Sequence, residues 1–478
     1  MQFKKILNSI SFYRIALFFF FLVFFLESLF FALYIREAIF PDEGHHLRLS
    51  QLYSETYTNL KNSEESYHLG DIEHIPYLYH WIGGRILNVK KVIFPFVEDL
   101  FVLRVFSVIL GVVNLYIAYQ IVKRVTKEKL QHVLLIAMLS STPMFSFISA
   151  GVSYDPLVFL FSFLSILLTL KLLERNSISL LLSLVITMLA GILTKKTFLP
   201  LVVVIIFFLI IKTFQERKEY LNIIKRSLKD KRELRHIIFL LLVTFFFLFL
   251  SLNLYLRNII KYKNLIPSCT QVMQEEDCMK DPEFLRDLAL QENAPPRAER
   301  LKPYWYIPHW VYLMINTTYA ICGHKAVKLS YSQFIRFFMI IILGLIMFVR
   351  KYDVKNPKYN FLVILSLFYT FTLMFYVNYQ SYLWRGVIGV ALQGRYIFPV
   401  IVPIYICVIE GLLLFKNKYM RVTIFGVILF VFLYGNIPFF VRNLTADWFF
   451  ENAGDIRTVL NVKDSLYIIN HNIKRFLP

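Results

Sequence analysis

Apolar residues gather in long blocks along the chain, separated by short polar and charged segments. Blocks of roughly 20 residues have the length that an α-helix needs to cross a bilayer. We therefore expect an all-α, polytopic membrane protein with about 11 transmembrane helices. The predicted spans are residues 14–39, 101–122, 131–150, 156–173, 178–194, 197–212, 237–257, 334–350, 359–378, 396–415 and 422–440.

Lysine and arginine are concentrated in the segments between these spans. Lys4, Lys5 and Arg14 predict a cytoplasmic N-terminus, and five such segments then fall on the same side, as the positive-inside rule requires. They are residues 123–129, 172–177, 212–236, 350–358 and 416–421. The first apolar run is too long for a signal peptide and lacks a small-residue cleavage site, so we expect it to be a retained span.

The alternation of sides leaves a first outer loop at residues 40–100 and a large outer loop at residues 258–333. Residues 45–60 and 76–89 each place apolar side chains on one helical face, and the second begins at Pro76, a favourable first helical residue. We interpret both as amphipathic helices at the membrane surface. Packing helices of a small outer domain are the alternative.

Composition agrees with this organisation. The chain has 478 residues, of which 57% are hydrophobic and 18% charged, with a formal net charge of +20. Because the cations lie between apolar runs, we expect no nucleic-acid partner. We divide the chain into a transmembrane domain at residues 1–440 and a C-terminal outer-face tail at residues 441–478.

Carboxylates occur at two predicted outer turns. Asp42 and Glu43 follow the first span, and Asp155 ends the short turn between the third and fourth spans. Two carboxylate sites at one membrane depth can divide the roles of general base and orienting group. Each acid could instead serve only to cap a helix.

Cations also occur on the predicted outer face, against the usual bias. Lys195 and Lys196 lie in one outer turn, and Arg385 and Arg395 in another segment. Lysine and arginine at this depth suit the phosphate of a lipid substrate, although contact with ordinary headgroups would also explain them. Together, the acids and cations predict a reaction at the outer leaflet, in which a hydroxyl attacks a lipid-borne sugar and the lipid phosphate departs.

Histidines and cysteines add two open questions. Five of the ten histidines lie in the first outer loop, at positions 45, 46, 68, 74 and 80. They follow no established ligand spacing, so we predict no metal site, while a divalent cation stays an open alternative. Cys269 and Cys278 could form a disulfide in an oxidising compartment or stay as two free thiols.

Three quoted segments carry a family resemblance. "PDEGHHLRLSQLY", "HIPYLYHWIGGRI" and "LRVFSVILGVV" resemble the opening of the GT-C superfamily of polyprenyl-phosphate-sugar-dependent glycosyltransferases. The group of protein O-mannosyltransferases and lipid A aminoarabinose transferases is the most similar. "QGRYIFPVIVPIY" also resembles a large group of bacterial membrane proteins placed near that superfamily.

This resemblance implies roles for particular residues. Asp42 matches the essential acid of the first outer loop, with Glu43 beside it, and Asp155 matches the second acid. The remaining candidates are for substrate binding. Tyr77 and Tyr79 belong to the "PYLYHW" element near the sugar, Lys195 and Lys196 to the lipid-phosphate region, and Arg395 and Tyr396 to "QGRY"; His45, His46, His74 and Arg385 are further candidates. Ile75 replaces a usual proline in "PYLYHW", so the local turn is expected to differ.

The leading prediction is a GT-C-type glycosyltransferase that moves a hexose or pentose from a polyprenyl-phosphate donor to a hydroxyl of a cell-envelope acceptor. We place it in the bacterial inner membrane, with its site facing the periplasm. No cofactor is required by this scheme. A polysaccharide polymerase or ligase, and a flippase or transporter of lipid-linked glycans, are the alternatives, and a transporter would have charged or broken helices in mid-span.

Overall fold

The computed structural model describes residues 10–58, 63–64, 66, 76–227, 229–415 and 417–449. This part of the chain is almost wholly helical and contains one short hairpin of two antiparallel strands. The longer helices are α2 (Ile10–Tyr34), α3 (Glu43–Glu55), α5 (Leu78–Ile93), α6 (Asp99–Val125), α7 (Lys129–Ser140), α9 (Asp155–Glu174), α10 (Ile178–Ile192), α11 (Leu199–Gln215), α12 (Arg217–Ser227), α13 (Lys231–Tyr262), α16 (Pro282–Glu292), α17 (Pro303–Thr318), α18 (Tyr331–Lys351), α19 (Pro357–Phe371), α21 (Ile401–Leu412) and α22 (Lys418–Tyr434). The shorter elements are α8 (Pro143–Ile148), η1 (Lys196–Phe198), α14 (Cys269–Val272), α15 (Glu275–Cys278), η2 (Arg297–Glu299), β1 (Ile321–Cys322), β2 (Ala326–Val327), η3 (Thr372–Tyr379), α20 (Gln380–Arg385), η4 (Gly394–Val400), α23 (Ile437–Asn443) and η5 (Ala446–Trp448).

The chain is a multi-pass membrane protein. Nine helical runs in the described part are long and apolar enough to cross a bilayer, and each lies on one of the predicted spans. The other two predicted spans, residues 131–150 and 178–194, also contain helices. However, α7 and α10 have only 12 and 15 residues, so the count of 11 is not confirmed. The first of them stops early because the helix breaks at Ser141 and Thr142 and restarts as α8 at Pro143.

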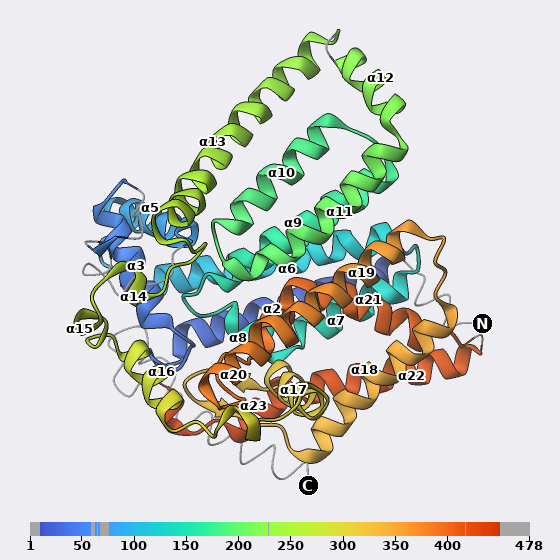
Figure 1. Cartoon of the computed structure of the whole chain (residues 1–478). Helices are drawn as coiled ribbons and strands as arrows, with labels where there is room; N and C mark the ends of the chain where they lie inside the picture. The colour runs from blue at the N-terminus through green and yellow to red at the C-terminus, as the bar shows by residue number, and fades with distance from the viewer. Residues whose placement is uncertain are drawn as a thin grey trace.

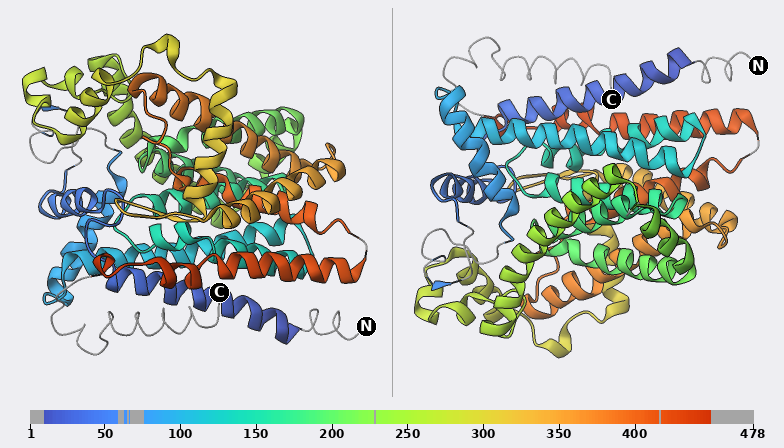
Figure 2. Two further views of the ribbon diagram at one scale, coloured as in Figure 1. Left: turned by 90° about the horizontal axis from the view of Figure 1, so that it is seen from below. Right: turned by 90° about the horizontal axis from the view of Figure 1, so that it is seen from above.

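Long helices run side by side through the centre of the molecule (Figure 1). Helix α6 packs against α9, and α18 against α21. Both views in Figure 2 place α2, in dark blue, along one edge of this bundle. The first and large outer loops lie together at the end of the bundle opposite the start of α2 (Figure 1). The fold therefore brings these two polar regions to one end.

The first outer loop contains both expected amphipathic helices. Helices α3 and α5 pack closely, and a Cβ at Gly84 would lie 2.5 Å from the Tyr53 carbonyl carbon. The second helix begins at Leu78 and not at Pro76, which corrects the predicted start. The reason is tertiary, because the Leu78 N–H donates to the Leu193 carbonyl (3.0 Å). Placement of these helices on a membrane surface stays a prediction.

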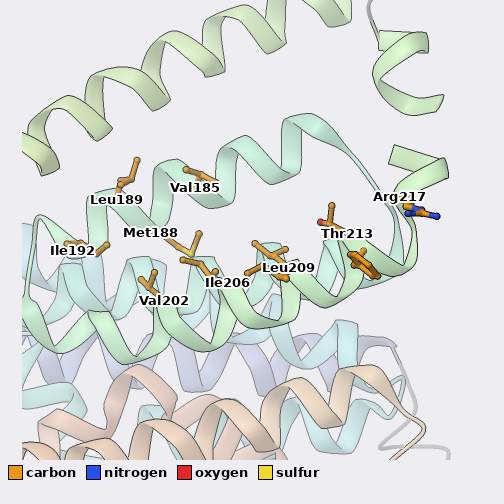
Figure 3. A pocket seen from close by; sticks show the side chains of 11 residues that line it. Val185, Met188, Leu189, Ile192, Val202, Ile206, Leu209, Thr213 and Arg217 are labelled. Carbon is orange, nitrogen blue, oxygen red and sulfur yellow. The ribbon is translucent and has the colours of Figure 1, made fainter. Parts of the chain in front are cut away.

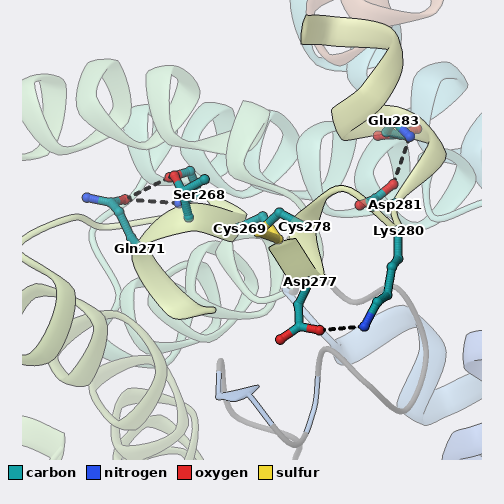
Figure 4. The surroundings of a disulfide bond; sticks show 9 residues. Ser268, Cys269, Gln271, Asp277, Cys278, Lys280, Asp281 and Glu283 are labelled. Atoms are coloured by element: carbon teal, nitrogen blue, oxygen red, sulfur yellow. Dashed lines mark hydrogen bonds and ion pairs between the residues drawn. A yellow bond between two sulfur atoms is a disulfide. The ribbon is translucent and has the colours of Figure 1, made fainter. Parts of the chain in front are cut away.

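The large outer loop is built from short helices and a disulfide. Cys269 and Cys278 are bonded, with a Cα–Cα distance of 5.9 Å, and this closes the α14–α15 turn (Figure 4). A bond at this site is the outcome expected of an oxidising compartment. Beyond the bundle, residues 444–449 run back along the end of α2, where the Arg36 N–H donates to the Trp448 carbonyl (2.8 Å). The rest of the predicted tail, from residue 450, lies outside the described residues.

Candidate active site

Two acids and two cations from four separate segments meet at the loop-bearing end of the bundle. Lys195 Nζ lies 2.6 Å from Asp155 Oδ1. Arg395 Nη1 lies 3.3 Å from Asp155 Oδ2, and Arg395 Nη2 lies 2.9 Å from Asp42 Oδ2. We call Asp42, Asp155, Lys195 and Arg395 the charged cluster. The juxtaposition expected from the sequence is therefore present, while the chemical roles of these residues stay predictions.

The local backbone positions each side chain of the charged cluster. Asp42 precedes α3 with a left-handed backbone (φ 58°), a conformation that aspartate tolerates better than most residues. Asp155 opens α9, and Lys195 lies in extended backbone between α10 and η1. Arg395 follows Gly394, where a Cβ would lie 2.3 Å from the Thr318 backbone nitrogen, so only glycine allows this approach.

The charged cluster is buried on one side and open on the other. The side chains of Asp155, Lys195 and Arg395 are 2%, 9% and 3% exposed, whereas that of Asp42 is 40% exposed. Asp42 is therefore the member that a molecule from outside reaches first. The contact between Arg395 Nη1 and Asp155 Oδ2 lacks hydrogen-bond geometry, and both atoms are buried without a hydrogen-bond partner in the described part of the chain.

Burial and neighbouring charge shift the pKa values of two members. Burial alone would raise the pKa of Asp42, but the charge and hydrogen bond of Arg395 outweigh it and hold the pKa below its usual value. Burial lowers the pKa of Lys195 to about 8, although the adjacent Asp155 carboxylate offsets part of this effect. At neutral pH, the charged cluster thus holds an ionised Asp42 and a Lys195 whose charge is lost at mildly alkaline pH.

Aromatic rings cover the cations of the charged cluster. Lys195 Nζ lies 4.2 Å from the centre of the Tyr154 ring and 4.9 Å from that of Tyr396. The Arg395 guanidinium lies 5.3 Å from the Tyr396 ring centre. Ring faces attract cations and exclude water. The predicted residue Tyr396 therefore belongs to the wall of this site, and Tyr154 is a wall residue that sequence reasoning did not single out.

An apolar groove begins close to the charged cluster. It lies between α10 and α11, and Figure 3 shows side chains of both helices facing it. Its volume is about 640 Å³. The groove extends from Ile192, three residues before Lys195, to Arg217 at the far end of α11. Its lining is almost wholly aliphatic and aromatic, as suits a hydrocarbon chain.

Residues 86–255 match the family model described as dolichyl-phosphate-mannose-protein mannosyltransferase. The match covers 170 of the 478 residues. Among curated proteins, no sequence matches this chain significantly.

Several solved structures have a similar arrangement of helices. The ArnT structure from Cupriavidus metallidurans, bound to undecaprenyl phosphate, has 15% identity and a TM-score of 0.46, and the match covers 86% of this chain and 61% of that one. The Archaeoglobus fulgidus oligosaccharyltransferase in complex with Zn and sulfate has 12% identity and a TM-score of 0.49, covering 88% and 52%. The chain thus spans about three-fifths of the ArnT chain and about half of the oligosaccharyltransferase.

Glu43, the neighbour of Asp42, lies outside the charged cluster. Its two oxygens accept hydrogen bonds from Arg104 Nε (2.8 Å) and Nη2 (2.6 Å), and one of them also accepts from the Val152 N–H (3.0 Å). Both side chains of this ion pair are 0% exposed. Arg104 also donates to the Ala32 and Ile35 carbonyls at the end of α2. The arrangement is that of a buried structural tie between α2, α3 and α6.

His46, a predicted substrate-binding residue, contacts His80. His46 Nδ1 and His80 Nε2 lie 3.0 Å apart, and the His46 ring centre lies 4.4 Å from that of Tyr154. Burial lowers the pKa of His80 to about 3 and that of His46 well below its usual value, so both rings are neutral near pH 7. His45 is partly exposed beside them. The two histidines therefore lie next to Tyr154, which in turn contacts Lys195.

The other predicted residues in the described part are not members of the charged cluster. Lys196 is exposed at the start of η1, and Tyr77 packs with Tyr53 beneath α3. Tyr79 is buried against His46 and His80. Arg385 pairs with Asp287 of α16 in the large outer loop. His74 lies outside the described residues.

One neighbour of Asp42 was missed in the sequence. His324, in the turn between β1 and β2, accepts a hydrogen bond through Nε2 from the Asp42 N–H (3.3 Å). The turn can come this close because residue 323 is a glycine. A Cβ at this position would lie only 2.1 Å from the Ile39 carbonyl oxygen. No local pattern indicates a contact across 282 residues of sequence, so sequence reasoning had no signal for it.

The described residues do not form a metal site. Among them, no group of three or more histidine, cysteine, aspartate or glutamate side chains is placed to hold an ion. His46 and His80 use ring nitrogens on each other, and Asp155 is engaged by two cations.

Proposed function

We propose that this protein is a membrane glycosyltransferase of the GT-C type, which moves a sugar from a polyprenyl-phosphate donor to an acceptor hydroxyl. The observation that carries the proposal is the charged cluster, in which an accessible carboxylate faces two buried cations. Arg395 Nη1 has no hydrogen-bond partner in the described residues, and a phosphate oxygen of the donor would supply one. Arginine and lysine together suit an anionic phosphate.

The reaction follows from this geometry. Asp42 accepts the proton of the acceptor hydroxyl while that oxygen bonds to the anomeric carbon of the sugar. The bond between the anomeric carbon and the lipid phosphate oxygen breaks, and its electron pair leaves with the phosphate. Lys195 and Arg395 stabilise the negative charge that develops there. Asp155 touches both cations and acts as the residue that positions them.

The apolar groove supports a lipid-linked donor. It begins three residues before Lys195, so a hydrocarbon chain that lies between α10 and α11 would bring its phosphate to the charged cluster. The family model that matches residues 86–255 is described by a dolichyl-phosphate-mannose donor and a protein acceptor. This favours a hexose on a long isoprenoid phosphate, with a pentose as the second choice. We infer that the site faces the outside of a bacterial inner membrane, where cell-envelope hydroxyls are available.

The proposal is tested with the full-length protein reconstituted in vesicles. Radiolabelled polyprenyl-phosphate hexoses and pentoses are offered with a cell-envelope extract, and release of the lipid phosphate is measured. We expect the wild type to consume at least one donor and Lys195→Met to be slower by about 10²–10³-fold. Lys90→Met is the matched control, because Lys90 pairs with Asp99 in the first outer loop. Consumption of no donor, or equal loss in both variants, would contradict the proposal.

The groove is tested by filling it. Leu209→Trp places a larger ring in the groove lining, whereas Phe207→Trp changes an exposed neighbour on the same helix. We expect Leu209→Trp to raise KM for a long-chain donor severalfold while KM for a short-chain analogue stays the same. Phe207→Trp should change neither constant. An equal effect on both chain lengths would show that the lipid tail lies elsewhere.

A further inference from the structure

A second pocket, which is polar, lies at the end of the bundle opposite the charged cluster. It occupies about 320 Å³ beside the ends of α6 and α9 and the start of α19. Since α9 begins at Asp155 and ends at Glu174, the pocket is about 28 Å from the candidate active site along the helix. It is lined by Gln120, Lys123, Arg124, Val125, Thr126, Lys127, Glu174 and Lys358.

The charge of this pocket is strongly unbalanced. Four of its lining side chains are cationic, and Glu174 is the single carboxylate among them. Both oxygens of Glu174 are already in use: Oε2 lies 2.6 Å from Arg124 Nη1, and Oε1 lies 2.7 Å from Lys358 Nζ. Lys123 and Lys127 are exposed and have no carboxylate partner among the residues that line the pocket. Two cations therefore face the pocket with their charge uncompensated.

Helix dipoles do not neutralise this excess. The ends of α6 and α9 each contribute about half a negative charge, and the start of α19 contributes about half a positive one. The sum is roughly −0.5, against about +3 from the side chains after Glu174 is counted. The first amides of α19 are also already bonded, because the Asn356 side chain accepts from the Lys358 and Tyr359 N–H groups. A bound anion would balance this excess of positive charge.

We propose that this pocket binds the phosphate headgroup of an anionic membrane lipid. Lysine and arginine between helix ends at a membrane interface bind such headgroups, and the hollow is about ten times the volume of one water molecule. A lipid source is favoured over a free ion because α6 exposes apolar side chains just before the pocket, including Val113 and Tyr116. Its acyl chains would lie along that face while Lys123 and Lys127 hold the phosphate.

The test uses the full chain in phosphatidylcholine nanodiscs, titrated with phosphatidylglycerol and examined by native mass spectrometry. We expect the wild type to retain one phosphatidylglycerol molecule. The double variant Lys123→Ala/Lys127→Ala should bind it about thirtyfold more weakly. The ion pairs of Glu174 are untouched in this variant, so its thermal stability should match the wild type. Lys127→Gln alone provides a milder version, with an expected loss of about fivefold.

The matched control is Lys225→Ala/Arg226→Ala, which removes two exposed cations from α12, outside the pocket. It should bind the lipid as the wild type does. Equal binding in all variants, or equal loss in the control, would overturn the proposal. Inorganic phosphate is added as a competitor. Failure to displace the lipid supports a headgroup site, whereas displacement at concentrations equal to the lipid would overturn it in favour of free phosphate.

Discussion

Asp42 and Glu43 are consecutive acids with opposite surroundings. Asp42 is 40% exposed and touches one arginine, Arg395, through a single oxygen. Glu43 is 0% exposed, and both of its oxygens are held by Arg104. The two side chains diverge because Asp42 has a left-handed backbone and Glu43 is the first residue of α3. Two carboxylates one residue apart can thus serve a site and a scaffold, respectively.

The arginine partner distinguishes the surroundings of Asp42 from those of Glu43. Arg104 forms two parallel hydrogen bonds with Glu43, the geometry in which a buried ion pair ties elements together. Arg395 is shared between Asp42 and Asp155, and two of its buried nitrogens, Nε and Nη1, have no hydrogen bond in the described part of the chain. A saturated ion pair serves structure, whereas an incompletely bonded one leaves room for a substrate.

The largest effect is expected at Asp42. Asp42→Asn keeps the shape and tolerates the left-handed backbone, but it removes the base that accepts the acceptor proton. We expect the transfer rate to fall by about 10²–10⁴-fold, with thermal stability little changed. The assay is donor consumption in vesicles, with Asp99→Asn as a control acid in the same loop. Full activity of Asp42→Asn would remove the distinction between the two acids.

Glu43 should show the opposite behaviour. Glu43→Gln leaves the Arg104 charge buried without its partner, and we expect about 3–5 kcal/mol of lost stability. Unfolding of the purified protein in detergent measures this loss. Glu37→Gln is a matched control, because Glu37 is exposed and the change should stay within about 0.5 kcal/mol. A stable but inactive Glu43→Gln would instead assign Glu43 to the chemistry.

The pH dependence should identify Lys195 as the cation that Asp155 positions. Burial lowers the Lys195 pKa to about 8, so its charge is lost above that pH and transfer should slow roughly tenfold per pH unit. Lys195→Arg should move this alkaline limb upward, because arginine stays protonated. Rates are measured from pH 6 to about 10 in vesicles. An alkaline limb that does not move would assign the titration to another group.

Stability should change with pH in the other direction. An unfolded lysine titrates near 10.5, so between about 8 and 10.5 the native state binds fewer protons than the unfolded state. The Lys195 contribution therefore makes the free energy of unfolding rise with pH across this interval. A simple loss of folding at high pH would lower activity and stability together, and the two measurements separate these explanations.

The smallest expected effect concerns the backbone of Asp42. At φ 58°, alanine costs more than asparagine, so Asp42→Ala should be less stable than Asp42→Asn by about 1 kcal/mol. Both variants should be equally inactive. Unfolding in detergent measures the difference. Equal stabilities would mean that the turn adjusts freely and that the left-handed backbone does not aim this side chain.

Much of this molecule could be predicted from local pattern. Long blocks of apolar residues located all nine long helical runs of the described part, because each helix satisfies its own backbone within the membrane. It overestimated residues 131–150, where apolar composition continues through the break at Ser141 and Thr142. The charged residues of the predicted outer face included Asp42, Asp155, Lys195 and Arg395, which lie in contact in the structure.

The local sequence pattern did not predict which charged residues form ion pairs with each other. Nothing in the sequence around residue 43 shows that Arg104, 61 residues away, takes this carboxylate. Arg385 and Arg395 lie in the same predicted outer segment. Arg385 pairs with Asp287 because the large outer loop brings Asp287 next to it. Such pairings depend on tertiary contacts, which periodicity and composition do not encode.

The contact between Arg395 and Asp42 joins residues 353 positions apart in the chain. A ribosome that has released only the first seven of the nine long apolar helices in the described part has therefore delivered the carboxylate but not its guanidinium. The candidate site comes into being only when the last part of the bundle inserts. A copy terminated before residue 395 would therefore lack this contact.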